Sequence, residues 1–469
     1  MLIDDLKNGE SDQLEFKLVP NRDSAKWLKT VVAFANGRGG RIVFGVSDDR
    51  RVVGLDGDLF ALKDGIADAI ADACSPLVPF ELCVSTVEGR PVIVLEVAEG
   101  RHPPYFIKAM GDSGGVFVRY DASTRQADEM SLKELRVEGS GRGYDEIRCR
   151  GLQVNANDVE DLCKRMYQVA CDNASGEDER KLIKPVQSAQ LVKWGVLKNA
   201  GKGYVATHAY ALLVGSELFS PVVKCALFKG TTRSVFIDRR QFSGPADIQI
   251  EQAYDWVLSK INLGAEFGHG IRRKDVYEIP IGAIREIIAN AVAHRSYVNG
   301  EESPITVALY DDRLEVTSPG KLPHGVSVAK MREGCSECRN KALAQALAYM
   351  NVIEDWGSGI PRVREDLASA GLQDLDIREW PNAVRVVIYR RSPSNRGGDS
   401  GGNEVRLERS ARIVELMREN PSISVSAIVS VIGGGKRSVE REIAALKASG
   451  RIARKGTYAG KWMVLGAYN

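Results

Sequence analysis

The sequence predicts an α+β protein built from several domains. The chain has 469 residues, which is too many for one hydrophobic core. Short segments with alternating apolar residues, typical of strands, occur between segments with helical spacing. Residues 392–404 contain no apolar side chain and predict a flexible linker. We therefore expect domains at 1–140, 141–275, 276–391 and 405–469, the last one tethered by the 392–404 linker.

The composition is that of a globular protein without a membrane segment. Apolar residues make up 44% and charged residues 27% of the chain, and the net charge is only +2. A nucleic-acid surface must therefore come from local clusters of basic residues. There is no run of about 18 apolar residues, and the acidic start is unlike a signal peptide. We expect a cytoplasmic location and no membrane partner.

The eight cysteines are scattered along the chain. Cys335 and Cys338 have the spacing of metal ligands, but no second pair would complete a tetrahedral site. The pattern favours reduced thiols.

The first domain begins with a polar segment, a helix and a buried strand. Residues 10–17 read Glu-Ser-Asp-Gln-Leu-Glu-Phe-Lys, and residues 24–36 have a Ser cap and apolar residues at helical spacing. Glycines 37, 39 and 40 end this helix, and residues 41–46 form a strand that leads into Ser47-Asp48-Asp49. Further strands are expected at 92–97 and 116–120, separated by His102-Pro103-Pro104-Tyr105, which the prolines keep extended.

These motifs occur in an order that resembles the Schlafen AlbA-type domain over residues 1–137. The resemblance implies binding of nucleic acid, DNA or RNA. Some Schlafen members cleave RNA with two Glu and one Asp around a divalent metal. The matching carboxylates here are Glu10, Glu15 and Asp48 (or Asp49), and Lys17 would hold a phosphate. Clustered carboxylates suit Mg²⁺ or Mn²⁺. The alternative is that Glu10 and Glu15 pair with Lys or Arg and the domain binds without cutting.

The middle region carries little functional signal. Helices are expected at 157–170 and 248–261, a strand at 222–228, and a polar hairpin or loop at 236–244. Residues 203–219 predict a helix that ends before Pro221. We interpret 141–275 as a connecting α+β region packed against its neighbours.

The most informative stretch is 285–297. Glu286, Asn290 and His294 are spaced i, i+4, i+8, which places them on one face of a helix with apolar residues opposite. A carboxylate can orient water, and a neutral amide can coordinate Mg²⁺ without adding charge. The alternative is a solvated helix face.

The segments that follow favour a nucleotide site. Residues 305–310 and 313–317 predict a hairpin, Ser318-Pro319-Gly320 a turn, and Gly357-Ser358-Gly359 the start of a helix. This order resembles the GHKL ATPase superfamily, in a divergent form labelled as RecG-helicase-related and transcription-regulator-like. The resemblance implies an α/β sandwich that binds ATP. Glu286 would match the water-orienting base and Asn290 the Mg²⁺ ligand, with His294 on the same face.

The glycines complete this resemblance with one departure. Gly357 and Gly359 would match the residues whose backbone N–H groups approach phosphate, and Gly320 lies in the first glycine segment. Ser318 stands where the family has the Asp that reads adenine. We therefore expect weak base recognition. No G-x-x-x-x-G-K-[ST] loop is present, which argues against a helicase motor.

The last domain resembles a winged helix-turn-helix. Helices are expected at 410–420, 424–432 and 436–449, followed by a two-stranded wing at 451–464. Basic and polar residues open the third helix, where a recognition helix contacts DNA, and further basic residues lie on the wing. The expected DNA-binding residues are Lys436, Arg437, Ser438, Arg441, Arg454, Lys455 and Lys461. The alternative is a winged helix used for dimerisation or protein contacts.

The sequence as a whole favours a DNA-binding transcriptional regulator with a nucleotide-sensing GHKL-like module. A homodimer is expected, because winged-helix regulators often bind two half-sites. The alternative function is a metal-dependent nuclease acting on RNA or DNA, in nucleic-acid defence. A third hypothesis is a working ATPase switch, with Glu286 as its catalytic base.

Overall fold

The computed structural model divides the chain into two compact units, residues 1–391 and 392–469. It describes residues 6–7, 9–20, 25–201, 203–267, 273–298, 300, 303–323, 325–335, 337–354, 357–380, 382–390, 412–418, 420–432, 439–440, 443, 446–447, 452–455 and 461–464. Helices and sheets are mixed, and separate apolar cores form along the chain. The predicted multidomain α+β class is confirmed.

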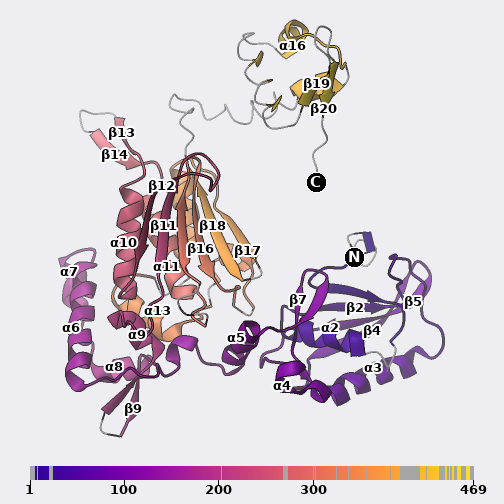
Figure 1. Ribbon diagram of the computed structural model, residues 1–469, viewed down its shortest axis with the longest axis horizontal. Coiled ribbons are helices and arrows are strands. Elements are labelled where there is room, and N and C mark those ends of the chain that lie inside the picture. The colour runs from indigo at the N-terminus through magenta and orange to yellow at the C-terminus, as the bar shows by residue number, and fades with distance from the viewer. Residues whose placement is uncertain are drawn as a thin grey trace. The chain divides into compact units, whose positions relative to one another are not determined.

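The first part of the larger unit contains a four-stranded sheet in the order β1-β2-β5-β4 (Figure 1). Its strands and helices are β1 Leu14–Lys17, α2 Ala25–Ala35, β2 Gly40–Phe44, α3 Leu59–Ala73, β3 Cys74–Ser75, β4 Phe80–Val87, β5 Arg90–Val97, β6 Phe106–Ile107, α4 Gly111–Gly114, β7 Phe117–Tyr120, β8 Ser123–Gln126 and α5 Glu129–Gly139. β1 runs parallel to β2, and the other neighbours in this sheet are antiparallel. Apolar residues of α2, α3, β2 and β5 form one core.

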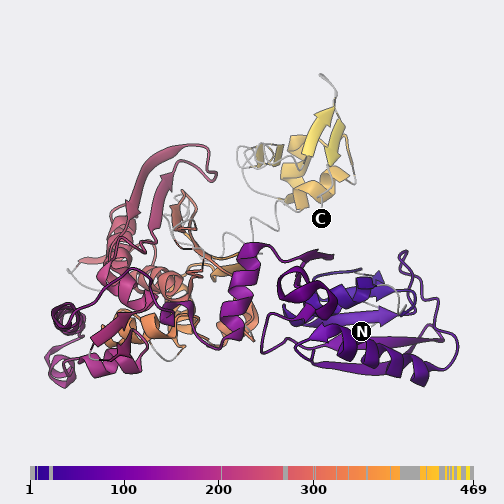
Figure 2. The same ribbon diagram turned by 60° about the horizontal axis from the view of Figure 1, so that its bottom comes forward.

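The second part of the larger unit is built on a six-stranded sheet in the order β12-β11-β15-β16-β18-β17. Its elements are α6 Ala156–Asp172, α7 Glu177–Leu182, α8 Ser188–Lys193, β9 Leu197–Ala200, β10 Gly203–Ala206, α9 His208–Val214, β11 Val223–Phe228, β12 Phe236–Phe242, α10 Ala246–Leu258, β13 Leu263–Phe267, β14 Arg273–Tyr277, α11 Ile281–His294, β15 Ile305–Leu309, β16 Arg313–Pro319, α12 Val328–Arg332, α13 Lys341–Tyr349, α14 Gly359–Ser369, β17 Asp376–Trp380 and β18 Ala383–Tyr389. Figure 2 shows the β11–β12 hairpin arching out beyond its neighbours.

The six-stranded sheet crosses the boundary expected at 275/276. β11 pairs in parallel with β15, with Val223 opposite Ile305. One core, running in sequence from Cys149 to Ile388, includes apolar residues from both sides of that boundary. Residues expected as a connecting region therefore supply two strands and several helices of the same sandwich.

Local patterns were correct for some elements and wrong for others. The helix expected over 203–219 is wrong in its first part, because residues 203–206 pair with β9 as strand β10 around the turn at Gly201. The helix proper is α9, which ends at Gly215 in the left-handed conformation. The hairpin or loop expected at 236–244 contains the edge strand β12.

A buried carboxylate stabilises the start of α13. Asp145 is fully buried, and its Oδ2 accepts a hydrogen bond of 2.9 Å from the backbone N–H of Leu343. Burial raises the pKa of Asp145 to about 7. This hydrogen bond joins residues almost 200 positions apart and satisfies a helix N–H that has no partner within the helix.

The smaller unit contains a helical segment at 412–418, helix α16 Val425–Ile432, and the antiparallel strands β19 Ile452–Lys455 and β20 Lys461–Val464. Apolar residues including Ile413, Ile428, Val439 and Trp462 form its core. The two strands lie where the wing is expected. Most of the segment expected as the third helix lies outside the described residues, so the winged-helix fold stays a prediction.

Candidate functional site

Helix α11 carries the three polar residues singled out by their spacing. Its apolar residues, from Ala283 to Ala293, are buried in the core of the sandwich. Glu286 is 8% exposed, and its Oε1 accepts a hydrogen bond of 2.8 Å from Nδ2 of Asn290. The expectation that these two side chains share a face is therefore met.

The environment of Glu286 suits a group that exchanges protons. Burial raises its pKa, while the hydrogen bond from Asn290 and the charge of Arg362 act in the opposite direction. The Arg362 guanidinium, on α14, lies 3.4 Å from Oε2 of Glu286. A raised carboxylate pKa brings a general base closer to neutral pH.

Gly359, one of the two glycines expected to approach phosphate, lies beside this carboxylate. Gly359 begins α14, and a Cβ atom at this position would overlap the carboxylate of Glu286. Gly357 has φ of +68°, in the left-handed region that favours glycine. Two segments more than 70 residues apart in sequence therefore meet, with the first residue of α14 against the Glu286 carboxylate.

The remaining predicted residues lie toward the other end of α11. The Ser318 hydroxyl donates a hydrogen bond of 2.9 Å to the Ala291 carbonyl. Gly320 has φ of +101°, and a Cβ there would lie 2.7 Å from Arg339 Nη1 and from the Ser296 side chain. The Ser318 side chain therefore binds the backbone of α11.

His294 also belongs to this end of the helix. Burial, with a smaller contribution from the Arg339 charge, lowers its pKa to about 4, so the imidazole is neutral at physiological pH. Eight residues separate His294 from Glu286, which corresponds to about 12 Å along a helix axis. The polar face of α11 thus extends from the Gly357–Gly359 segment to the end of β16, where Ser318 and Pro319 are paired strand residues and not part of the expected turn.

Sequence reasoning missed the side chains that hold these groups. Arg362 is three residues after Gly359, so its position in the first turn of the glycine helix was a usable signal. Asn340 is fully buried and donates hydrogen bonds of 2.9 Å to the carbonyls of Ala293 and Arg295, at the end of α11. Its Oδ1 has no hydrogen-bond partner among the described residues. No local pattern marked that role.

Two of the helix-ending glycines of the first domain, Gly37 and Gly39, border a cavity that residues of the second part of the larger unit also line. Asn36 is buried and exchanges hydrogen bonds with the backbone N–H and C=O of Tyr105, which ties two of the predicted motifs together. Gly39 has φ of +73°, and a Cβ there would lie 2.6 Å from the Val97 carbonyl. The cavity, of about 390 Å³, is lined in part by Arg38, Arg119, Lys321 and Trp380.

The three predicted carboxylates of this domain have different partners. Glu15 is buried between Lys17, at 2.5 Å, and Arg119, whose guanidinium also donates to the carbonyls of Ser11 and Leu14. Glu10 accepts a hydrogen bond of 2.9 Å from the backbone N–H of Phe16. Asp48 is exposed, and its neighbour Asp49 binds Ser47 and Arg51.

The strand pairing required for a three-carboxylate site is present, since β1 and β2 run side by side. Among the described residues, however, no group of three or more His, Cys, Asp or Glu side chains is arranged to hold a metal ion. Glu15 compensates Arg119 and Lys17 instead. This arrangement favours the alternative in which the carboxylates are structural.

The predicted DNA-binding residues of the last domain fall into two groups, one outside the described residues and one on the strands β19 and β20. Lys436, Arg437, Ser438 and Arg441 lie outside the described residues. Arg454 and Lys455 are residues of strand β19, and Lys461 is a residue of strand β20, where the wing is expected.

The described helices were also compared with the length and hydropathy of a membrane span. Among them, none combines the length and the apolar character that crossing a membrane requires.

Two segments of the chain match known domain families. Residues 10–128 match the family described as Schlafen, AlbA_2, and residues 302–388 match the one described as putative ATP-dependent DNA helicase recG C-terminal. The resemblances stated from the sequence for these two segments are confirmed, while the resemblance of the last domain to a winged helix stays a prediction. The second match starts after α11 and ends in β18, so it omits the helix that carries Glu286 and Asn290.

Several proteins are similar to this chain, over different shares of its length. An uncharacterized ATP-binding protein, UU034 of Ureaplasma parvum, is 35% identical over 152 residues, which is 28% of this chain and 43% of that protein. The chain thus covers less than half the length of that relative. Two solved structures are also similar: the DIP2311 protein of Corynebacterium diphtheriae and the N-terminal domain of a putative RecG-related helicase protein of Nitrosomonas europaea.

The structural similarity is limited in both cases. The diphtheria protein is 18% identical with a TM-score of 0.41, covering 97% of this chain and 79% of that one. The Nitrosomonas domain is 28% identical with a TM-score of 0.22, covering 27% of this chain and 91% of that one.

Proposed function

We propose that this chain is a cytoplasmic, homodimeric DNA-binding transcriptional regulator whose 276–391 module senses ATP with Mg²⁺. The observation that carries the nucleotide part is the close approach of the Glu286 carboxylate to Gly359, with Asn290 hydrogen-bonded to the same carboxylate. The description of the Ureaplasma relative as ATP-binding supports it. The match to a Schlafen AlbA_2 domain supports a nucleic-acid partner.

Each residue has a defined part in this proposal. The Asn290 side-chain oxygen would hold Mg²⁺, which neutralises phosphate charge when bound. The N–H groups at the start of α14 would contact phosphate oxygens, because a helix N-terminus favours anions. Glu286 would orient a water molecule, so the module becomes a working ATPase switch if turnover occurs. Ser318 leaves the base weakly recognised.

For the first domain we propose binding without cleavage. Glu15 is committed to Arg119 and Lys17, and removing a carboxylate from a buried ion pair is costly. A metal ion would have to displace both cations to use this side chain. The paired strands β1 and β2 meet one requirement of the nuclease hypothesis, but the ion pairs of Glu15 speak against it.

The decisive experiment measures two bindings on the full chain. Labelled duplex DNA is titrated with protein in Mg²⁺, Mn²⁺ or EDTA, so that binding and cutting are read in one gel. A chain ending at Ser392 should lose most duplex affinity. Equal affinity of that truncation and the full chain would overturn the DNA-binding assignment of the last domain.

The nucleotide part is read by thermal shift with ATP, GTP and a non-hydrolysable ATP analogue. Asn290→Ala should abolish the Mg²⁺-dependent shift, while Glu286→Ala should keep binding and lose any turnover. The matched control is Asn199→Ala, which removes an exposed amide on strand β9. If millimolar nucleotide stabilises none of these proteins, the module is a scaffold.

A further inference from the structure

The six-stranded sheet has a second face that the nucleotide site does not use. Val223, Val307, Leu314, Val316 and Ile388 point into the core beneath the helices. Because strand residues alternate between faces, their neighbours lie on the opposite side. There Lys224, Arg239 and Gln241 are exposed, and Phe236 and Trp380 are 59% and 46% exposed. We call this side of the sheet the outer face.

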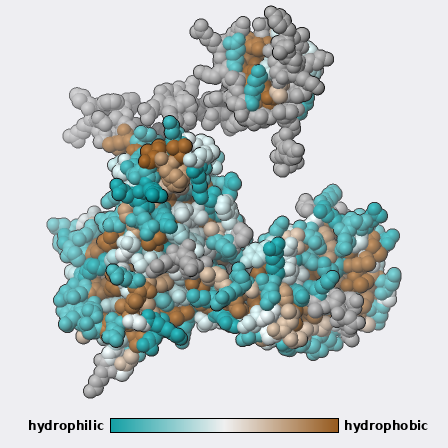
Figure 3. Space-filling view, in the orientation of Figure 1, coloured by the Kyte–Doolittle hydropathy of each residue, from teal (hydrophilic) through white to brown (hydrophobic). Residues whose placement is uncertain are grey.

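Aromatic rings form a row across one end of the outer face. The rings of Phe236 and Phe228 are 4.6 Å apart, and Phe228 stacks on Tyr310 at 5.0 Å. The Arg313 guanidinium follows, 4.1 Å from the centre of the Tyr310 ring. Figure 3 shows apolar surface gathered at this end of the β11–β12 hairpin, where Val235, Phe236 and Ile237 are more than half exposed.

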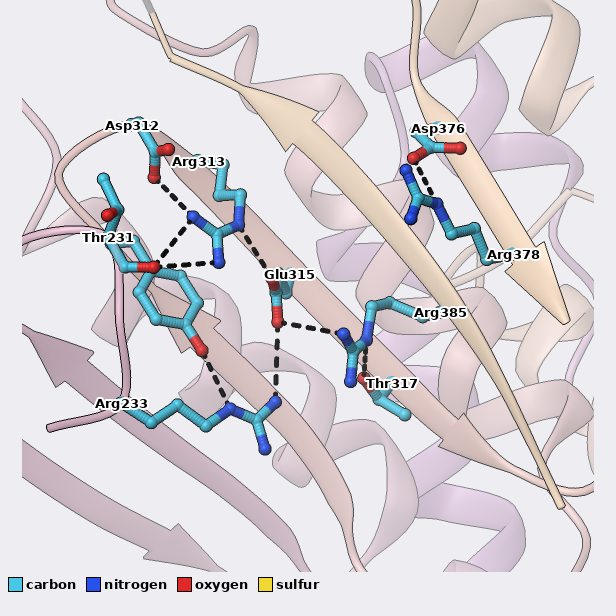
Figure 4. A network of polar contacts seen from close by, with 10 residues as sticks. Thr231, Arg233, Asp312, Arg313, Glu315, Thr317, Asp376, Arg378 and Arg385 are labelled. Atoms are coloured by element: carbon cyan, nitrogen blue, oxygen red, sulfur yellow. Dashed lines mark hydrogen bonds and ion pairs between the residues drawn. The ribbon is translucent and has the colours of Figure 1, made fainter. Parts of the chain in front are cut away.

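A buried carboxylate in the middle of the face gathers three guanidinium groups. Figure 4 shows Glu315 between Arg313, Arg233 and Arg385, at distances of 2.7, 3.5 and 3.7 Å. Arg385 also lies over the Trp380 ring, 4.0 Å from its centre. Arg313 also forms an ion pair of 2.8 Å with Asp312, so two carboxylates face three cations in this cluster. The two longer ion pairs, of Arg233 and Arg385, leave N–H donors available to a ligand.

The strand register aligns further cations with this cluster. Lys224 is opposite Thr306, Thr306 opposite Thr317, Thr317 opposite Arg385, and Arg385 opposite Arg378. Strands lie about 4.8 Å apart, so this row is about 20 Å long. Among the described residues of the outer face and its loops, the cations are Lys224, Lys229, Arg233, Arg239, Arg313, Arg378 and Arg385, and the acids are Asp311, Asp312, Glu315 and Asp376.

We propose that the outer face binds an unpaired nucleic-acid strand. Phosphates would lie along the cation row, and bases would stack on Trp380, Phe236 and the guanidinium planes. A duplex keeps its bases stacked inside and would leave those rings without a partner. A second copy of the chain is disfavoured as the partner, because a twofold dimer would bring two copies of the same positively charged face together. This inference goes beyond the duplex binding proposed for residues 405–469.

The test is fluorescence anisotropy of the full chain with labelled single-stranded oligothymidylate and oligouridylate. Lys224→Glu and Arg239→Glu change exposed side chains outside the apolar core, and each should weaken single-strand binding about tenfold. Lys193→Glu, at the end of α8, makes the same charge change elsewhere and should have no effect. Trp380→Ala should weaken binding about tenfold, and Trp380→Phe should restore most of it.

Salt dependence gives a readout that loss of structure would not reproduce. Removal of one phosphate-binding cation should reduce the slope of log affinity against log salt by about 0.7. Duplex binding, measured in parallel, should be unchanged, which separates this proposal from the regulator assignment. Equal affinity of Lys224→Glu and Lys193→Glu would overturn the proposal. So would a wild-type chain that binds neither oligonucleotide, or variants that convert a dimer to a monomer without changing strand affinity.

Discussion

The Glu286 carboxylate occupies the space that a side chain at position 359 would need. The two residues belong to different helices, α11 and α14, so the base and the start of the glycine helix constrain each other. A short glycine motif does not specify this packing, because it requires α14 to approach α11 at one particular residue.

Gly359→Ala should therefore disturb the nucleotide module. The added methyl group overlaps the carboxylate, and overpacking of this kind costs about 1–3 kcal/mol. Thermal unfolding should show a lower midpoint and no response to Mg²⁺ and ATP. Gly282→Ala is the control, since that helical glycine has only the end of the Asp366 side chain nearby, at 3.2 Å. Equal midpoints for the two variants would contradict the prediction.

Replacement of Arg119 should destabilise the first domain more than replacement of Asp48. Arg119 is almost completely buried and compensates Glu15, so Arg119→Ala leaves a buried carboxylate with Lys17 alone and costs about 3–5 kcal/mol. Asp48→Asn changes an exposed group and should leave the melting temperature unchanged. Melting in Mn²⁺ and in EDTA is the second measurement. If Mn²⁺ raises the melting temperature of the wild type but not that of Asp48→Asn, the result would support the three-carboxylate metal site.

Asp145 should make stability depend on pH. Its pKa is raised by burial to about 7 in the folded chain, against about 3.9 when unfolded. A raised carboxyl pKa contributes stability that is complete below about pH 4 and is lost as the pH rises toward about 7. The loss is on the order of 2–4 kcal/mol. Asp145→Asn should remove this dependence while keeping an acceptor for the Leu343 N–H.

Melting temperatures of both proteins from about pH 4.5 to about pH 8 test this prediction. The difference between Asp145→Asn and wild type should shift in favour of the variant as the pH rises. Asp178→Asn, at an exposed position on α7, is the control and should track the wild type. A constant difference between wild type and Asp145→Asn over the range would contradict the assignment.

Arg437 and Arg441 should contribute to duplex binding, although they lie outside the described residues. Arg437→Ala and Arg441→Ala should each weaken binding by about 1–3 kcal/mol if the side chains reach base edges. A relaxed sequence preference would indicate that the side chain contacts a base. Equal weakening of binding to all sequences, with a smaller slope of log affinity against log salt, would indicate that it contacts a phosphate. Unchanged affinity in both variants would favour a winged helix used for protein contacts.

The sequence predicted best where the signal was local. The spacing of Glu286 and Asn290 placed both on one helix face, and alternation located the strands β15 and β16 nearly to the residue. Interactions between residues that are distant in sequence could not be predicted. Arg119 is 104 positions from Glu15, and nothing near either residue indicates the pair. The outer face could not be predicted for the same reason, since its cations come from several strands whose register only the fold defines.

The parallel pairing of β11 with β15 also affects how the chain is made. Val223 leaves the ribosome 82 residues before its partner Ile305, a delay of roughly 4 to 16 s at ordinary translation rates. Until then the β11 edge has exposed N–H and C=O groups and apolar Val223 and Cys225 without their cover. The first domain has its four strands by Val97 and is free to fold long before. Synthesis is therefore the stage at which the central sheet is most open to chaperones and to wrong partners.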